Sequence, residues 1–325
     1  MTDENGKSIN ATGRLVFGYH NHRRELIKSG LATPFRNTKK TASTTEGVSI
    51  SDEQVLKNLQ ILKDPEVLSE QALTLWSDTF HARLDDFDKK YSSIEEYLNT
   101  YPILKSPVGA KLFRLDFKEK FPNYEISLLN AWNKVKEKVL SFASDVLKED
   151  LNLLQILQHD DVDLEVADSK LLTVAAFRLI GYYSSVCKAI KGSNGKIWHP
   201  DKKDAMNSVL LLVKSSANIT LSIDEEIEKV AKFGLTLQPL PIAVVNEKEV
   251  VSSHFFINGK LHFCESPLDA IDLAFKTYQV LNATYPPAGK MPWLFVQRFI
   301  YKINTRYDGK CLTPLNFARK IKLVA

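Results

Sequence analysis

The sequence predicts an α+β protein that is predominantly helical, with an N-terminal helical part followed by a smaller part that contains an antiparallel sheet. Two observations support this prediction. Between residues 51 and 190, apolar residues recur every three or four positions, which is typical of amphipathic helices. From residue 191 onward, short runs rich in β-branched and aromatic residues are separated by turn residues, and two helical patterns close the chain. This order of elements is typical of an α+β fold.

Composition along the 325 residues divides the chain into three predicted segments. Residues 1–50 are polar and are expected to form a flexible basic arm. Residues 51–190 form the predicted helical domain, and residues 191–325 form the predicted α+β domain. The boundary lies at the glycine-interrupted basic loop that begins at Lys191.

Caps and apolar stripes mark the helices of the first domain. Ser51 and Gln54 fit a capping box, which predicts a helix start. After Pro65, one continuous stripe predicts a single long helix that carries Leu73, Trp76, Phe80, Leu84 and Phe87. Further helices are expected after Ser92, after Ser106-Pro107, over Leu128–Val146 and over Leu171–Val186.

The second domain has a clear hairpin signal. Asn258-Gly259 separates the predicted strands Val250–Ile257 and Lys260–Cys264, and this dipeptide supplies the positive φ angles of a type I′ turn. Two more strands are expected, over Ser208–Val213 and Leu240–Val245. Ser266-Pro267 and Pro292 are expected to open the two closing helices.

Cysteine usage and hydropathy indicate the compartment. The three cysteines, Cys187, Cys264 and Cys311, are far apart, which argues against a disulfide framework or a zinc ribbon. The longest apolar run, Leu171–Phe177, is far shorter than a membrane helix, and the N-terminus lacks the apolar segment of a secretory signal. We expect an intracellular protein, cytoplasmic or nuclear, with no membrane contact.

Charge is distributed unevenly along the chain. Residues 11–40 carry seven basic residues against one acid, and residues 288–325 carry eight against one. Residues 145–170 carry eight acids against two lysines. The basic ends could bind a polyanion such as RNA or DNA. They could equally attract the acidic middle or keep the surface soluble.

No motif in the sequence predicts a reaction centre. Gly192–Lys196 lacks the spacing of a phosphate-binding loop. His81 and Asp85 share a helix face that could hold a divalent metal, but they lie on the polar side of a core-forming helix, where a solvated face is the simpler interpretation. His262 and Cys264 share a face of a predicted strand, but no orienting third group is evident. We therefore expect no catalytic residue, no metal ligand and no cofactor.

Basic residues interleaved with aromatic residues are the strongest binding signal, because stacking and phosphate contacts together suit single-stranded nucleic acid. Arg298 and Lys302 are predicted to form a basic stripe on the last helix, opposite Trp293. The alternative is that the tryptophans belong to the core. The candidate nucleic-acid-binding residues are Arg14, Arg23, Arg24, Lys39, Lys40, Lys196, Trp198, Arg298, Lys302 and Arg306.

Several short stretches together resemble a metazoan family. They are Trp76–Arg83, Tyr97–Pro102, Gly109, Asp116-Phe117, Leu237–Ile242, the hairpin, Asp269–Lys276, Tyr285-Pro286 and Trp293–Ile303. Over roughly residues 50–325, the chain is similar to the conserved region of sterile-alpha-motif-containing protein 3-like sequences, although no sterile alpha motif precedes that region here. The resemblance implies the architecture and assigns no catalytic residue.

Taken together, these patterns predict a non-enzymatic interaction or scaffold protein, with a protein partner, RNA or DNA as its ligand. Its contact surfaces would be the basic arm and the basic C-terminal region. The alternative is a hydrolase or nuclease with an unrecognised active site. A homo-oligomer joined through aromatic faces also stays open.

Overall fold

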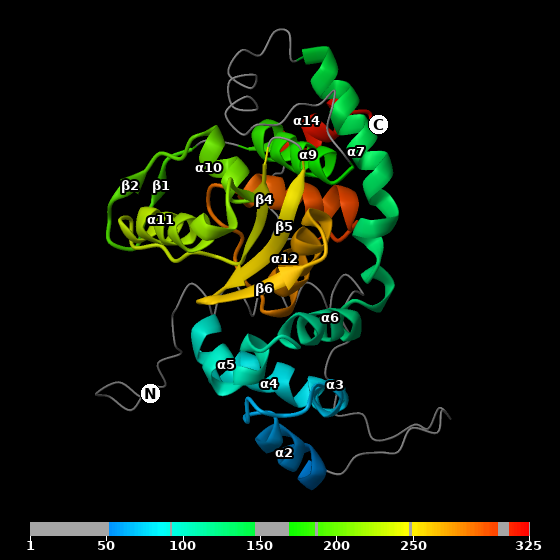
Figure 1. Ribbon diagram of the computed structural model, residues 1–325, viewed down its shortest axis with the longest axis vertical. Helices are drawn as coiled ribbons and strands as arrows, with labels where there is room; N and C mark the ends of the chain where they lie inside the picture. Colours follow the sequence, from blue (N-terminus) through cyan, green and yellow to red (C-terminus); the bar gives the residue numbers. More distant parts are fainter. Residues whose placement is uncertain are drawn as a thin grey trace, which may run out of the picture.

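A computed structural model of the chain describes residues 52–91, 93–146, 169–185, 188–246, 249–304 and 312–324. Over these residues the fold is α+β and mostly helical, which confirms the predicted class. Helices surround a central four-stranded sheet, and a small two-stranded sheet lies to one side of it (Figure 1). The predicted arm, residues 1–50, lies outside the described residues.

The N-terminal part is built from helices. They are α2 (Asp52–Ile61), α3 (Ser69–Asp78), α4 (Phe80–Lys90), α5 (Ile94–Thr100), η1 (Pro102–Lys105), α6 (Gly109–Lys120), η2 (Pro122–Tyr124), α7 (Ser127–Val146) and α9 (Ser169–Ser184). The prediction of one long helix through Trp76 and Phe80 is wrong, because the chain leaves helical geometry at Thr79. The Thr79 hydroxyl donates to the carbonyl oxygen of Leu75 at 2.7 Å, and Thr79 also accepts a hydrogen bond from Arg83.

The C-terminal part mixes strands and helices. They are β1 (Ile190–Lys191), β2 (Ile197–Trp198), α10 (Lys202–Asn207), β3 (Leu211–Val213), η3 (Ser216–Asn218), α11 (Ile219–Ala231), β4 (Leu240–Val245), β5 (Val250–Ile257), β6 (Lys260–Cys264), α12 (Pro267–Val280), α13 (Lys290–Phe295), η4 (Val296–Ile300) and α14 (Leu312–Lys320). Strands β4, β5 and β6 have the predicted bounds. Ser266 caps α12 by accepting from the amide of Asp269. Helices α10 and α14 were not predicted.

The central sheet has the strand order β3-β4-β5-β6. Strand β3 runs parallel to β4, and the other neighbours are antiparallel. Asn258 and Gly259 have φ angles of 42° and 78°, as the predicted type I′ turn requires. This turn sets the register in which Phe255 faces His262 and His254 faces Phe263.

The two faces of the sheet are covered differently. Helix α12 packs against one face, where Phe255 and Cys264 belong to the main core. On the other face, Ile219 and Ile223 of α11 join Ile242 and their neighbours in a second, smaller core.

The main core continues through both predicted domains. Trp76, Phe113 and Phe177 share it with Phe255 and Trp293. Helix α6 lies against α12, so elements of the two predicted domains are packed together (Figure 1). The predicted boundary between residues 190 and 191 falls inside β1.

Candidate functional site

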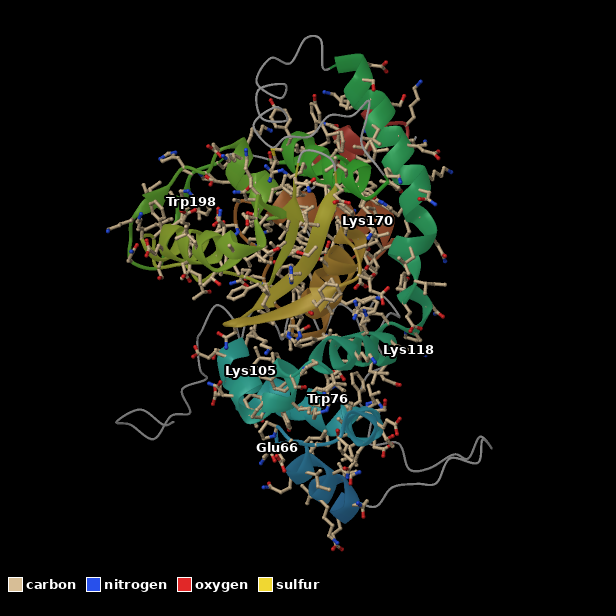
Figure 2. The ribbon with its side chains drawn as sticks, in the orientation of Figure 1. Glu66, Trp76, Lys105, Lys118, Lys170 and Trp198 are labelled. Carbon is tan, nitrogen blue, oxygen red and sulfur yellow. The ribbon has the colours of Figure 1, made fainter. Side chains whose placement is uncertain are left out.

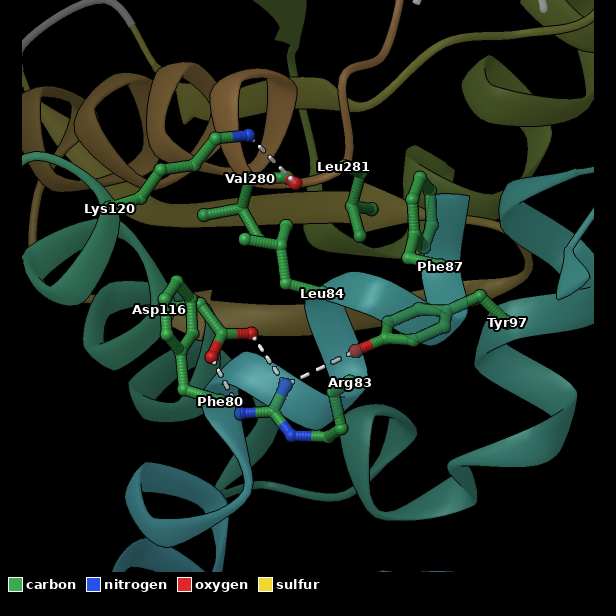
Figure 3. A pocket seen from close by; sticks show the side chains of 9 residues that line it. All are labelled: Phe80, Arg83, Leu84, Phe87, Tyr97, Asp116, Lys120, Val280 and Leu281. Atoms are coloured by element: carbon green, nitrogen blue, oxygen red, sulfur yellow. Dashed lines mark hydrogen bonds and ion pairs between the residues drawn. The ribbon is translucent and has the colours of Figure 1, made fainter. Parts of the chain in front are cut away.

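A buried ionic cluster lies between α3, α4, α5 and α6 (Figure 3). The Arg83 guanidinium holds both carboxylate oxygens of Asp116, at 2.7 and 2.9 Å. It also donates to Tyr97 Oη at 3.2 Å, to Thr79 Oγ1 at 3.1 Å and to the carbonyl oxygen of Trp76 at 2.6 Å. The guanidinium carbon lies 3.5 Å from the centre of the Trp76 ring. We call this group the Arg83 cluster.

The Arg83 guanidinium has no hydrogen-bond donor left for a ligand. A guanidinium carries five N–H donors, and all five are used within the cluster. Burial by itself lowers the pKa of Arg83, but Asp116 and Tyr97 outweigh burial and raise it. The cavity beside the cluster measures about 20 Å³, room for about one water molecule. The cluster therefore joins four helical segments rather than binding a substrate.

A second buried ion pair lies on α12. Lys276 Nζ lies 2.6 Å from Asp272 Oδ2, and the Tyr301 hydroxyl donates to Asp272 Oδ1 at 2.5 Å. Lys276 Nζ lies 5.5 Å from the ring centre of Phe117, which belongs to α6. Burial raises the pKa of Asp272, although Lys276 and Tyr301 act in the opposite direction. This pair joins α12 to the segment after η4 and to α6.

His262 and Cys264, one of the predicted reactive pairs, do lie on the same face of β6, and both are buried. Burial raises the pKa of the Cys264 thiol to about 12 and lowers the pKa of the His262 imidazole to about 4. A nucleophilic cysteine needs the opposite environment, one that stabilises a thiolate beside a cation. His262 is stacked on Phe255, and its Nε2 has no hydrogen-bond partner among the described residues.

The other predicted pair is only partly visible, because the described atoms do not include the side chain of Asp85. The exposed His81 lies beside the ring of Phe80. Among the described residues, no group of three or more His, Cys, Asp and Glu side chains comes together as a metal site. The expectations of no catalytic residue, no metal and no cofactor stay predictions.

Trp198 lies on β2 of the two-stranded sheet, and Lys196 directly precedes this strand, where its carbonyl oxygen accepts from the amide of Gly192. Trp198, whose position Figure 2 labels, is 8% exposed and stacks on Phe233 with ring centres 5.8 Å apart, so its ring is already packed. Lys196 is exposed, as is Lys191 on the neighbouring strand. This hairpin offers charge at the surface, while its tryptophan belongs to a small core with Val230 and its neighbours.

Arg298 and Lys302 do not form the predicted stripe on one helix. The helix that was predicted to be the last continues beyond α13 as the π-helix η4 and ends at Ile300, and Lys302 follows it with a φ of 62°. Arg298 Nε donates to Asn304 Oδ1 at 3.0 Å. The six remaining candidates lie outside the described residues: Arg14, Arg23, Arg24, Lys39, Lys40 and Arg306.

An apolar surface at the end of the central sheet was not singled out as a site from the sequence. On one face of the sheet, helix α11 covers strands β3 and β4, and Phe256 of β5 belongs to the same small core. Leu261 on β6 still packs against this core, and beyond it the cover ends at Phe263, which is 71% exposed. The open face, as we name it, carries Ser252, His254, Leu261 and Phe263.

The residues of the open face support one another. The rings of His254 and Phe263 lie edge to face, with centres 5.9 Å apart. Ser252 Oγ and His254 Nε2 share a hydrogen bond of 2.9 Å, and burial lowers the pKa of His254. No hydrogen bond joins a described carboxylate to the other ring nitrogen of His254, so the orienting member of a catalytic triad is missing from the described residues. The pair instead gives the aromatic surface a polar border.

Strand β6 is also an unpaired edge within the described part of the sheet. Natural sheets usually protect such edges with charge, proline or a covering segment, since an exposed edge can pair with another chain. The middle of β6, from Leu261 to Phe263, carries no Lys, Arg, Asp, Glu or proline residue. Alternation of apolar residues along β6 was visible in the sequence, but which face α11 leaves uncovered was not.

Comparisons with known proteins identify no relative of this chain. No protein-family model matches the chain, and neither a curated protein nor a solved structure matches it with significance. The resemblance to sterile-alpha-motif-containing protein 3-like sequences therefore stays a prediction. Among the described residues, no helix has both the length and the apolar character that crossing a bilayer requires.

Proposed function

We propose that this chain is an interaction protein that binds a protein partner through the open face and the adjoining edge of β6. The observation that supports this most directly is Phe263, a large aromatic side chain that is 71% exposed at the end of a well-formed sheet. Aromatic residues contribute most of the binding energy in many interfaces, so an exposed ring on a rigid element favours a contact surface.

The surroundings of Phe263 fit the same proposal. Leu261 lies on the same face two residues away and is half-buried. Apolar groups at the centre with Ser252 and His254 beside them match the usual composition of an interface, an apolar centre with a polar rim. By contrast, the buried charges of the Arg83–Asp116 and Lys276–Asp272 pairs are already paired with each other.

Site-specific photo-crosslinking in the native cell type tests this proposal. A photoreactive amino acid replaces Phe263 in one variant and Leu129 in a control, because Leu129 is 53% exposed on the remote helix α7. We expect discrete covalent adducts from position 263 and none of the same size from position 129. Identical adducts from both positions, or none from position 263, would contradict the proposal.

Nucleic-acid binding is a second candidate function, supported by the lysines of the β1–β2 hairpin. Lys191 and Lys196 are exposed there, and the predicted arm would add more charge. The expected result is a mobility shift of single-stranded RNA or DNA that weakens with salt and with the double variant Lys191→Glu/Lys196→Glu. Absence of a shift even at low salt would remove this candidate and leave the protein-binding proposal intact.

A further inference from the structure

We infer that the partner at the edge of β6 is a second copy of this chain, whose own β6 adds in antiparallel orientation to make one continuous sheet. This inference rests on the proposed function, because it uses the same edge and the same open face. It goes further by naming the occupant and the register.

The direction of the backbone groups supports strand addition. In a hairpin with a two-residue turn, the residues that flank the turn exchange hydrogen bonds, and every second residue after them does the same. Lys260, His262 and Cys264 therefore bond to β5, whereas Leu261 and Phe263 direct their N–H and C=O groups outward. No described residue bonds to these four outward groups.

One register satisfies all four outward groups. A two-fold axis at His262 places Leu261 opposite the partner's Phe263, and Phe263 opposite the partner's Leu261, so that each pair exchanges two hydrogen bonds. An axis at Phe263 would instead require the amide of Glu265, which already donates to Asp269 Oδ2 at 3.3 Å. The first register is therefore favoured.

The same register extends the open face across the axis. Leu261 and Phe263 point to the open side of the sheet, so each Phe263 ring lies beside the partner's Leu261. Cross-strand pairs of aromatic and aliphatic residues stabilise sheets by about 0.2–1 kcal/mol each. Both partners cover apolar surface that is exposed in one copy alone.

In this register Lys260 lies opposite the partner's Cys264, so the contact depends on the backbone hydrogen bonds and on the Leu261–Phe263 pairs rather than on charge. Because the edge is only five residues long, the interface is small and the dimer is expected to be weak, with dissociation in the micromolar range or above.

Sedimentation velocity of the full chain, from micromolar concentration upward, measures this dimer. Leu261→Pro removes an outward N–H that one copy does not use for its own fold, and Phe263→Asp places a charge in the apolar pair. Leu129→Asp is the matched control on α7. Far-ultraviolet circular dichroism of each variant establishes that it has folded.

The expected result is a dimer whose population rises with concentration, is lost in Leu261→Pro and Phe263→Asp, and is kept in Leu129→Asp. Hydrogen exchange provides a second readout, because the amides of Leu261 and Phe263 should become protected as concentration rises, while the amide of His262 stays bonded to β5 throughout. A chain that stays monomeric with unchanged exchange would overturn the inference, as would a dimer that both edge variants keep. If the chain is monomeric while position 263 crosslinks to a different protein, the proposed function stands and only the second copy is excluded.

Discussion

Around Arg83, charged and polar side chains are buried and paired with one another, whereas on the hairpin β5–β6 an aromatic side chain is exposed to solvent. Both arrangements depart from the common distribution, in which charge lies outside and large aromatic rings lie inside. In the Arg83 cluster every donor of the guanidinium is used, so the residues with the most obvious chemistry are committed to the fold. On the hairpin, the residues without reactive chemistry are the ones left free to bind.

Removing one partner of the Arg83 cluster is expected to have the largest effect. Asp116→Ala leaves a buried guanidinium without its counter-charge, which should lower the free energy of unfolding by about 3–5 kcal/mol. Urea denaturation measures the change. The matched control is Glu53→Ala, because Glu53 pairs with Lys57 in an exposed salt bridge of α2, and its loss should cost less than about 1 kcal/mol after screening by solvent. Equal losses of unfolding free energy in both variants would mean that the Arg83 cluster does not stabilise the fold more than an exposed salt bridge does.

Lowering the pH is expected to destabilise the fold through His262. Burial lowers the pKa of the His262 imidazole from an ordinary 6.5 to about 4 in the folded chain. Between pH 6.5 and pH 4, the imidazole is therefore protonated in the unfolded state and neutral in the folded state. The free energy of unfolding should therefore decline as the pH falls from 6.5 to 4, by up to about 3 kcal/mol. Denaturation at several pH values, compared with His262→Leu, checks this. A variant with the same slope as the wild type over that range would show that His262 does not cause the decline.

Removing the phenolic hydroxyl of Tyr301 is expected to have an intermediate effect. Tyr301→Phe removes the hydrogen bond to Asp272 and keeps the ring that stacks on Phe275. Hydrogen bonds to charged groups are worth about 1.5–3 kcal/mol, so the loss should lie in that range. Thermal unfolding measures it. Tyr124→Phe is a suitable control, because its half-buried ring lies outside this network, and a similar loss there would argue against a specific role for the Asp272 pair.

Changing the open face should barely affect stability. Phe263→Ser removes an exposed ring, and surface substitutions of this kind usually stay within about 0.5 kcal/mol. The comparison between the two regions predicts that this variant unfolds like the wild type in urea and yet loses its partner. A loss of several kcal/mol would instead place Phe263 among the residues that hold the fold.

The elements that were predicted well depend on local interactions. Asn258-Gly259 fixes the hairpin through its own positive φ angles, and Ser266 caps α12 three residues from the amide that it binds. The break at Thr79 was not predicted, because Thr79 also binds Arg83, whose position depends on Asp116 far along the chain. Such a non-local network leaves no periodic pattern in the sequence.

The candidate site was harder to predict for the same reason. Alternation along β6 shows that Leu261 and Phe263 share a face, but only tertiary packing decides that Leu261 packs against the core under α11 while Phe263 stays exposed. Trp198 was predicted as a stacking platform on its local basic context, while its ring is packed on Phe233, which lies thirty-five positions later in the chain. Exposure is a property of the whole fold, so sequence patterns indicate faces and leave open which of them stay uncovered.

The size of the native complex that carries the chain in cell extract tests the central claim most directly. Chemical crosslinking in intact cells retains a weak complex, and size-exclusion chromatography with immunodetection then compares the wild type, Phe263→Ser and the control Leu129→Ser at matched expression. We expect the wild type and Leu129→Ser to elute in the same larger assembly, and Phe263→Ser to elute as a smaller species. An unchanged elution profile for Phe263→Ser would contradict the claim that the open face binds the partner.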